Sequence, residues 1–195
     1  MQKTGVIRAY LESVEEKWAD RESMYHSLLG PGLVGCELGV EHGNNSEALI
    51  KSSNPSKLYL IDRWRRTHNA PKFAARQEGR FRHVKSKFKS NPRVSIIRES
   101  TDDASHRFSK ESLDWIYIDA NHVFAAALLD VQMWSPKIKP GGVLMLHDFS
   151  MDVAEGGVAE AAEYALKGSD VFEVIGKTSD RGEVQSAAYR KQGSR

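Results

Sequence analysis

Short apolar runs alternate with amphipathic stretches along most of the chain. Each run clusters Val, Ile, Leu or aromatic residues over about five positions, which predicts strands buried on both faces. The predicted strands are 33–38, 57–62, 93–98, 113–119 and 142–146. Apolar residues recur every three or four positions between them, which predicts helices. Strands alternating with helices favour a mostly parallel sheet covered by helices on both faces.

Both ends of the chain depart from this alternation. Apolar residues at helical spacing from Ile7 to Trp18 predict an N-terminal helical region over residues 1–30. After a last helix, two apolar runs at 171–177 and 184–190 are separated by a short polar segment. So short a connection requires a hairpin, and at least one of these strands is therefore antiparallel to its neighbour.

The expected fold is an α/β, Rossmann-like, doubly wound sheet of seven strands with an antiparallel C-terminal hairpin strand and an N-terminal helical extension. We expect one domain over residues 1–195. Its ligand-binding core would span 33–149, and residues 150–195 would supply the last helix and the hairpin.

Charge is unevenly distributed along the chain. The net charge is +2, but residues 63–89 hold ten Lys or Arg and one acid, a net charge of +9. Such a segment can face an anionic substrate or nucleic acid, or be a solvated helix face. The single cysteine, Cys36, excludes an internal disulfide and indicates a reducing cytosol. No apolar run approaches the roughly 18 residues of a membrane span, so we expect a cytoplasmic protein without a membrane partner.

Polar residues follow the predicted parallel strands where each strand ends. The carboxyl ends of parallel strands meet at one edge of the sheet, and ligands of such sheets bind there. The polar residues are Glu37, Asp62, Ser100, Thr101, Asp102, Asp119, His122, His147 and Asp148. A carboxylate at the end of the second strand can accept hydrogen bonds from both hydroxyls of a ribose.

Four pieces of sequence, in this order, resemble the class I S-adenosylmethionine-dependent methyltransferases. More narrowly, they are similar to the small-molecule O-methyltransferase branch, which includes catechol O-methyltransferase-like and antibiotic or sugar O-methyltransferases. The four pieces are Glu37-Leu38-Gly39-Val40-Glu41-His42-Gly43, Asp62, Ile118-Asp119-Ala120-Asn121-His122-Val123-Phe124, and Lys139-Pro140-Gly141-Gly142-Val143-Leu144-Met145-Leu146-His147-Asp148-Phe149. Asp130 and Trp134 match as well.

The resemblance implies S-adenosyl-L-methionine as cofactor. The residues it places around the cofactor are Glu37, Gly39, Gly43, Asn45, Ser46, Asp62, Ser100, Thr101 and Asp119. Glu37, Gly39 and Gly43 would shape the methionine end. Asn45 stands where relatives often have a small hydroxyl residue that contacts the methionine carboxylate, and Ser46 is next. Asp62 would bind the ribose, and Ser100 and Thr101 would lie near the adenine or, alternatively, cap the following helix.

The resemblance also implies the catalytic groups, which are Asp119, His122 and His147. A histidine with a pKa near neutrality can accept a proton from a hydroxyl. Asp119 and Asp148 match metal-binding acids, and His147 is a further candidate ligand. A divalent ion such as Mg²⁺ could then assist, but Phe149 replaces the third oxygen ligand of relatives, and imidazole suits softer ions better than Mg²⁺.

The predicted function is methyl transfer to a hydroxyl of a small polar molecule, such as a sugar or natural-product intermediate, and the arginines would suit an anionic one. The N-terminal helices and loops 63–71 and 149–157 would wall its pocket, with Trp64, Arg65, Arg66, His68 and Met151 among the wall residues. One alternative is a nucleic-acid methyltransferase that uses the basic segment 63–89. Another is a non-catalytic protein that binds adenosylmethionine. We expect a small-molecule rather than a nucleic-acid partner, and a homo-oligomer is compatible with the sequence.

Overall fold

The structure is a computed structural model that describes residues 9–65, 71–149, 157–166, 171–179 and 185–193. Residues 9–13 are helical. The elements that follow are β1 (Glu16–Trp18), α2 (Arg21–Leu28), β2 (Val34–Leu38), α3 (Asn44–Ser53), β3 (Lys57–Ile61), α4 (Pro71–Phe88), β4 (Val94–Ile97), α5 (Thr101–Ser105), β5 (Leu113–Ile118), α6 (Phe124–Trp134), the 3₁₀ helix η1 (Ser135–Lys137), β6 (Ile138–Leu146), α7 (Val158–Leu166), β7 (Phe172–Thr178) and β8 (Ala187–Lys191).

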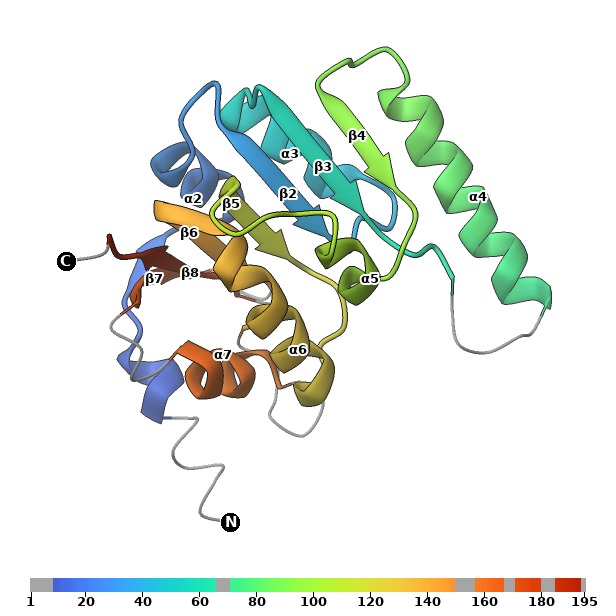
Figure 1. The fold of residues 1–195 in the computed structure, drawn as a ribbon. Coiled ribbons are helices and arrows are strands. Elements are labelled where there is room, and N and C mark those ends of the chain that lie inside the picture. Colours follow the sequence, from blue (N-terminus) through green and yellow to red (C-terminus); the bar gives the residue numbers. More distant parts are fainter. Residues whose placement is uncertain (1–8, 66–70, 150–156, 167–170, 180–184, 194–195) are drawn as a thin grey trace.

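One sheet organises the molecule (Figure 1). Its strand order is β1-β7-β8-β6-β5-β2-β3-β4, with β8 antiparallel to both of its neighbours and every other pair parallel. The strand order reverses direction between β2 and β5, which is where doubly wound sheets bind ligands. The predicted Rossmann-like α/β fold with its antiparallel hairpin strand is confirmed, and the sheet has one strand more than predicted.

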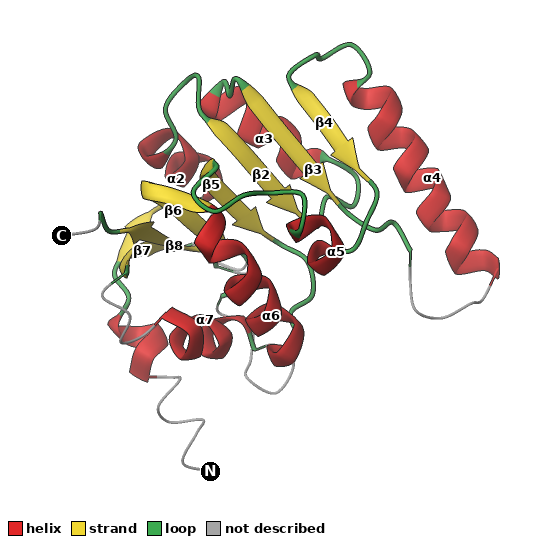
Figure 2. Ribbon diagram, in the orientation of Figure 1, coloured by secondary structure: helices red, strands yellow, loops and turns green. Residues whose placement is uncertain are grey.

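Helices cover both faces of the sheet (Figure 2). Successive side chains of a strand point to opposite faces. In β5, Ile116 and Ile118 therefore join the cluster beneath α5, α6 and α7, while Trp115 and Tyr117 join the cluster beneath α2, α3 and α4. All four are buried. This double burial explains why the strands read as continuous apolar runs. Among the described residues, no helix is both long and apolar enough to cross a bilayer.

The spacing had predicted an N-terminal helical region, but the described part of this region is not helical throughout. Residues 16–18 form the extra strand, β1, which runs parallel to β7 at the edge of the sheet. The Lys177 N–H donates to Glu15 O at 2.8 Å, and the Ser179 N–H donates to Trp18 O at 2.8 Å. A new helix, α2, then begins because Asp20 caps it with Ser23 in a capping box.

The strand β6 also begins earlier than predicted. Residues 138–141 already belong to this strand, which the sequence had predicted to begin at residue 142. The pairing of β6 with β5 is irregular here, because the register shifts between Leu113 and Trp115. Gly142 fits this irregularity, since a Cβ there would lie 2.5 Å from Asp114 O. The remaining strand boundaries within the described residues differ from prediction by at most three positions, and residue 184 lies outside those residues.

Candidate functional site

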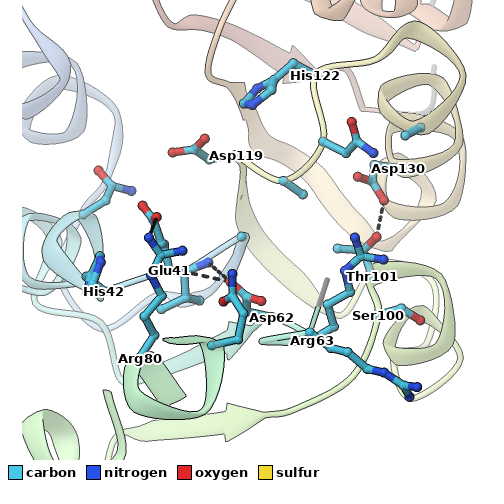
Figure 3. A pocket seen from close by; sticks show the side chains of 18 of the residues that line it. Glu41, His42, Asp62, Arg63, Arg80, Ser100, Thr101, Asp119, His122 and Asp130 are labelled. Atoms are coloured by element: carbon cyan, nitrogen blue, oxygen red, sulfur yellow. Dashed lines mark hydrogen bonds and ion pairs between the residues drawn. The ribbon is translucent and has the colours of Figure 1, made fainter. Parts of the chain in front are cut away.

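A cavity of about 620 Å³ lies at the carboxyl ends of β2, β3 and β5 (Figure 3). Loops after these strands supply its walls, together with residues of α2, α3, α4, α5 and α6. The residues around it are Arg21, Gly39, Val40, Glu41, His42, Asn44, Asn45, Asp62, Arg63, Arg65, Gln77, Arg80, Ser100, Thr101, Asp102, Asp119, Ala120, Asn121, His122, Ala126, Leu129 and Asp130. Most of the residues predicted from strand ends therefore meet at one place.

Gly39 makes the close approach of β2 to β5 possible. Its φ is +84°, in the left-handed region, and an added Cβ would lie 1.8 Å from Asp119 O. Only glycine fits both conditions. The backbone at the cavity floor is therefore exposed to whatever ligand the cavity holds.

Glu37 lies beneath the floor rather than on it. It is fully buried and accepts hydrogen bonds from Ser46 Oγ and, at 3.0 Å, from Asn45 Nδ2. Burial raises the pKa of Glu37 to about 8, although both hydrogen bonds act in the opposite direction. The Tyr25 hydroxyl completes this network by donating to Asn45 Oδ1 at 2.7 Å. Glu37 thus orients the first turn of α3, and Ser46 is buried against it.

Asp62 and Gly43 shape the loops around the cavity. The two carboxylate oxygens of Asp62 accept backbone N–H groups of Val40 at 3.1 Å, Glu41 at 3.0 Å and Trp64 at 2.6 Å. A carboxylate has about four lone-pair sites, so Asp62 can also accept from a ligand. Gly43 is absent from the cavity lining; it precedes α3 with φ +74°, and an added Cβ would lie 2.9 Å from Phe88.

The polar residues after β4 belong to the helix cap considered from sequence and also line the cavity. Ser100 is the N-cap of α5, where its Oγ accepts from the Asp103 N–H. Thr101 Oγ1 donates to Asp130, a buried carboxyl on α6, and Trp134 Nε1 donates to Thr101 O at 3.0 Å. Burial raises the pKa of Asp130 to about 6. Ser100 and Thr101 nevertheless line the cavity, so capping does not remove them from the site.

Two acids and two histidines meet at the ends of β5 and β6. His122 Nδ1 pairs with Asp148 Oδ2, and His147 Nδ1 lies 3.0 Å from Asp148 Oδ1 and 3.4 Å from Asp119 Oδ1. Asp148 adopts φ +56°, an uncommon conformation for a residue with a side chain. Such backbone strain is often found at functional sites.

The charges of this cluster support one another. Burial acts to lower the pKa of His147, but Asp119 and Asp148 outweigh it and raise the value to about 9. The hydrogen bond to Asp148 raises the pKa of His122. Burial acts to raise the pKa of Asp148, but both imidazoles bring it well below its usual range. His122 lines the main cavity, whereas His147 lies behind it in a pocket of about 10 Å³.

Part of this cluster offers ligand atoms for a metal ion. One atom each from Asp119, His122 and Asp148 lies within 4.8 Å of the others. The donor set, two carboxylates and an imidazole, suits Mn²⁺, Fe²⁺ or Zn²⁺ better than Mg²⁺. Phe149 is buried and apolar, so it adds no ligand. The sequence analysis had predicted Asp119 and Asp148 as metal ligands, but it had assigned His122 only as a base.

Two arginines of the cavity were not singled out by the sequence analysis, although the N-terminal helices had been predicted to wall the pocket. Arg21 is half-buried on α2, and the Tyr117 and Tyr25 hydroxyls with Asp119 raise its pKa although burial opposes this. Arg80 is buried on α4 and pairs with Glu41 at 2.6 Å. Neither arginine lies at a strand end. Among the basic residues of α4, only the position of Arg80 on the inner face of the helix could have distinguished it. The pocket-wall candidates Arg66, His68 and Met151 lie outside the described residues.

Comparison with known proteins gives a consistent answer for the fold. A family model described as a methyltransferase domain matches residues 36–149. No curated protein matches the sequence. Among solved structures, a Corynebacterium glutamicum protein is 13% identical with a TM-score of 0.62, and the match covers 100% of this chain and 92% of that one.

Two further structures carry named functions. An rRNA methylase from Streptococcus thermophilus is 13% identical, with a TM-score of 0.57 and coverage of 88% of this chain and 94% of that one. Aeropyrum pernix fibrillarin, solved with bound S-adenosyl-L-methionine, is 12% identical, with a TM-score of 0.58 and coverage of 82% and 67%. At these identities the likeness concerns the fold alone. The family model and the fold together show that this chain belongs to the methyltransferase domain family and has the class I S-adenosylmethionine-dependent methyltransferase fold.

Proposed function

We propose that the protein is an O-methyltransferase that transfers the methyl group of S-adenosyl-L-methionine to a hydroxyl of a small polar molecule. The observation that carries the proposal is the His122–Asp148 pair, which lies beside Asp119 at the cavity. When bound, the cofactor supplies an electrophilic methyl group on its sulfonium. The chain must then orient the acceptor hydroxyl and remove its proton.

The cofactor would lie across the ends of β2 and β3. Gly39 would then hold the methionine part, Asp62 the ribose, and Ser100 and Thr101 the adenine. The carboxylate of the methionine part needs a partner, and Ser46 and the Asn45 amide nitrogen are already engaged by Glu37. We assign this carboxylate to Arg21, whose guanidinium suits it.

His122 is the better placed of the two candidate bases. Its Nδ1 is held by Asp148, which fixes the ring and leaves Nε2 to accept the proton of an acceptor hydroxyl. His147 is shielded from the main cavity and holds Asp119 and Asp148 in place. We therefore give His122 the role of base and His147 the role of a positioning residue.

A divalent ion could take part at the same place. Asp119, His122 and Asp148 would hold it, and an ion there would lower the pKa of a bound hydroxyl. In that arrangement His122 would be a ligand and not a base.

The buried thiol of Cys36 is compatible with the cytosolic location expected from the sequence.

The test is a turnover assay. Formation of S-adenosylhomocysteine is followed over a panel of hydroxyl and amine acceptors and tRNA, with EDTA and with added Mg²⁺, Mn²⁺ or Zn²⁺, and products are identified by mass spectrometry. We expect O-methylated small molecules. Methylation of amines or of RNA alone would contradict the proposal, and binding of adenosylmethionine without any turnover would favour a non-catalytic protein.

A further inference from the structure

Four arginines from three parts of the chain reach the cavity. Arg21 comes from α2, Arg63 and Arg65 from the segment after β3, and Arg80 from α4. Figure 3 shows Arg80 against Glu41 on one side of Asp62 and Arg63 on the other side. Adenosylmethionine itself carries two positive groups, the sulfonium and the ammonium, and one negative group. The cavity is also lined by five carboxylates, so the arginines differ in whether an acid lies close to them; the carboxylates are Glu41, Asp62, Asp102, Asp119 and Asp130.

Two of the four arginines have an acid of the cavity close by. Asp119 acts electrostatically on Arg21. Arg80 has Glu41 at 2.6 Å. The remaining carboxylates contact other groups: Asp62 accepts three backbone N–H groups, Asp130 accepts from Thr101, and Asp102 has a hydrogen bond with Ser100.

Arg63 and Arg65 are the two arginines of the cavity for which the described residues supply no ion-pair partner. Both side chains are exposed, and no carboxylate of the described residues lies within 4.0 Å of either guanidinium. The only anionic group of the cofactor is its methionine carboxylate, which Arg21 would take at the β5 side of the cavity. Two planar guanidinium groups thus remain at the β3 side, and their geometry suits carboxylate or phosphate.

We propose that the methyl acceptor is itself an anion and that Arg63 and Arg65 bind its carboxylate or phosphate. This inference rests on the proposed function. The strands β3 and β5 flank β2, and neighbouring strands lie about 4.8 Å apart, so their ends are roughly 10 Å apart. The hydroxyl reacts near Asp119 at the end of β5. The acceptor must therefore reach several ångströms from its hydroxyl to its anionic group.

Binding to the S-adenosylhomocysteine-loaded protein tests the proposal with matched pairs of probes. Catechol and 3,4-dihydroxybenzoate differ by a carboxylate, and glucose and glucose 6-phosphate differ by a phosphate. Calorimetry should show that at least one anionic member binds at least tenfold more tightly than its neutral partner. The pair that shows the difference tells carboxylate from phosphate. Equal or absent binding in both pairs would overturn the inference.

A double variant locates the effect. Arg63→Gln with Arg65→Gln should remove the preference for the anion while S-adenosylhomocysteine affinity is retained. The matched control is Arg82→Gln with Lys85→Gln, which removes the same charge from exposed positions of α4 outside the cavity lining. If the control loses as much affinity as the double variant, the effect is general electrostatics and the inference fails. Failure of the wild type to bind S-adenosylhomocysteine would instead contradict the proposed function.

Discussion

Glu37→Gln is a sensitive test of the buried network beneath the site. Glutamine has the shape of glutamate, and its carbonyl can still accept from Asn45 while the Ser46 hydroxyl can rotate to accept from its amide. The variant therefore keeps the packing and removes the titration. Any difference between the variant and the wild type that changes with pH then reports the ionisation of this one buried carboxyl.

The sign and the size follow from the raised pKa. The folded protein holds the Glu37 proton up to about pH 8, whereas an unperturbed glutamate loses it near 4.5. Stability from this group is thus fully present below 4.5 and is lost as the pH rises to about 8. The loss is about 1.4 kcal/mol per pH unit within that window, or about 2.5 kcal/mol between pH 5 and 7. That is a large part of a typical net stability of 5–15 kcal/mol.

Urea unfolding followed by tryptophan fluorescence at pH 5, 6, 7 and 8 measures the effect. At pH 5 the two proteins should differ little, and by pH 7 Glu37→Gln should be the more stable by about 3 kcal/mol. Glu12→Gln, at an exposed position, is the control and should follow the wild type. A constant difference between the Glu37 variant and the wild type across this range would refute the reasoning.

Three further predictions concern the cavity. Gly39→Ala should abolish S-adenosylhomocysteine binding and destabilise the fold by several kcal/mol. Gly141→Ala is the control: Gly141 also has a positive φ, +81°, but no atom lies within 4 Å of the added Cβ, so the variant should cost only about 1 kcal/mol. Thermal melts and calorimetry compare the two variants. His122→Asn should lower kcat by about a hundredfold or more and leave cofactor affinity intact, while His147→Asn should lower it less; equal losses would remove the distinction between base and positioning residue. Arg21→Gln should weaken S-adenosylhomocysteine about tenfold and leave 5′-methylthioadenosine, which lacks the carboxylate, unchanged; equal weakening of both would place Arg21 elsewhere.

The sheet and the location of the site could be predicted because both depend on local patterns. Parallel strands buried on two faces read as apolar runs, and their polar ends must converge. The strand β1 could not be found in this way. Its three residues, Glu16 to Trp18, have no strand pattern, and they are extended because β7, far along the sequence, supplies hydrogen-bond partners.

The contacts within the site were less predictable than its location. Asn45 and Ser46 fall at the expected positions, but whether each faces the cofactor or Glu37 depends on packing in three dimensions. Gly43 fits a turn motif, but the close contact that leaves no room for a side chain there is with Phe88 on another helix. The role of Arg21 depends on how α2 folds over the end of β5, which no local spacing encodes.

The short strand β1 has a consequence for how the protein avoids aggregation. Without it, β7 would present a free edge of backbone N–H and C=O groups, and such edges pair readily with other chains. β1 covers part of that edge with only three residues, and two of them, Glu16 and Lys17, are charged and exposed, which discourages further strand addition. Removing residues up to Trp18 would therefore uncover the edge of β7 at Lys177 and Thr178, which would be prone to aggregation, even though no residue of the cavity would be lost.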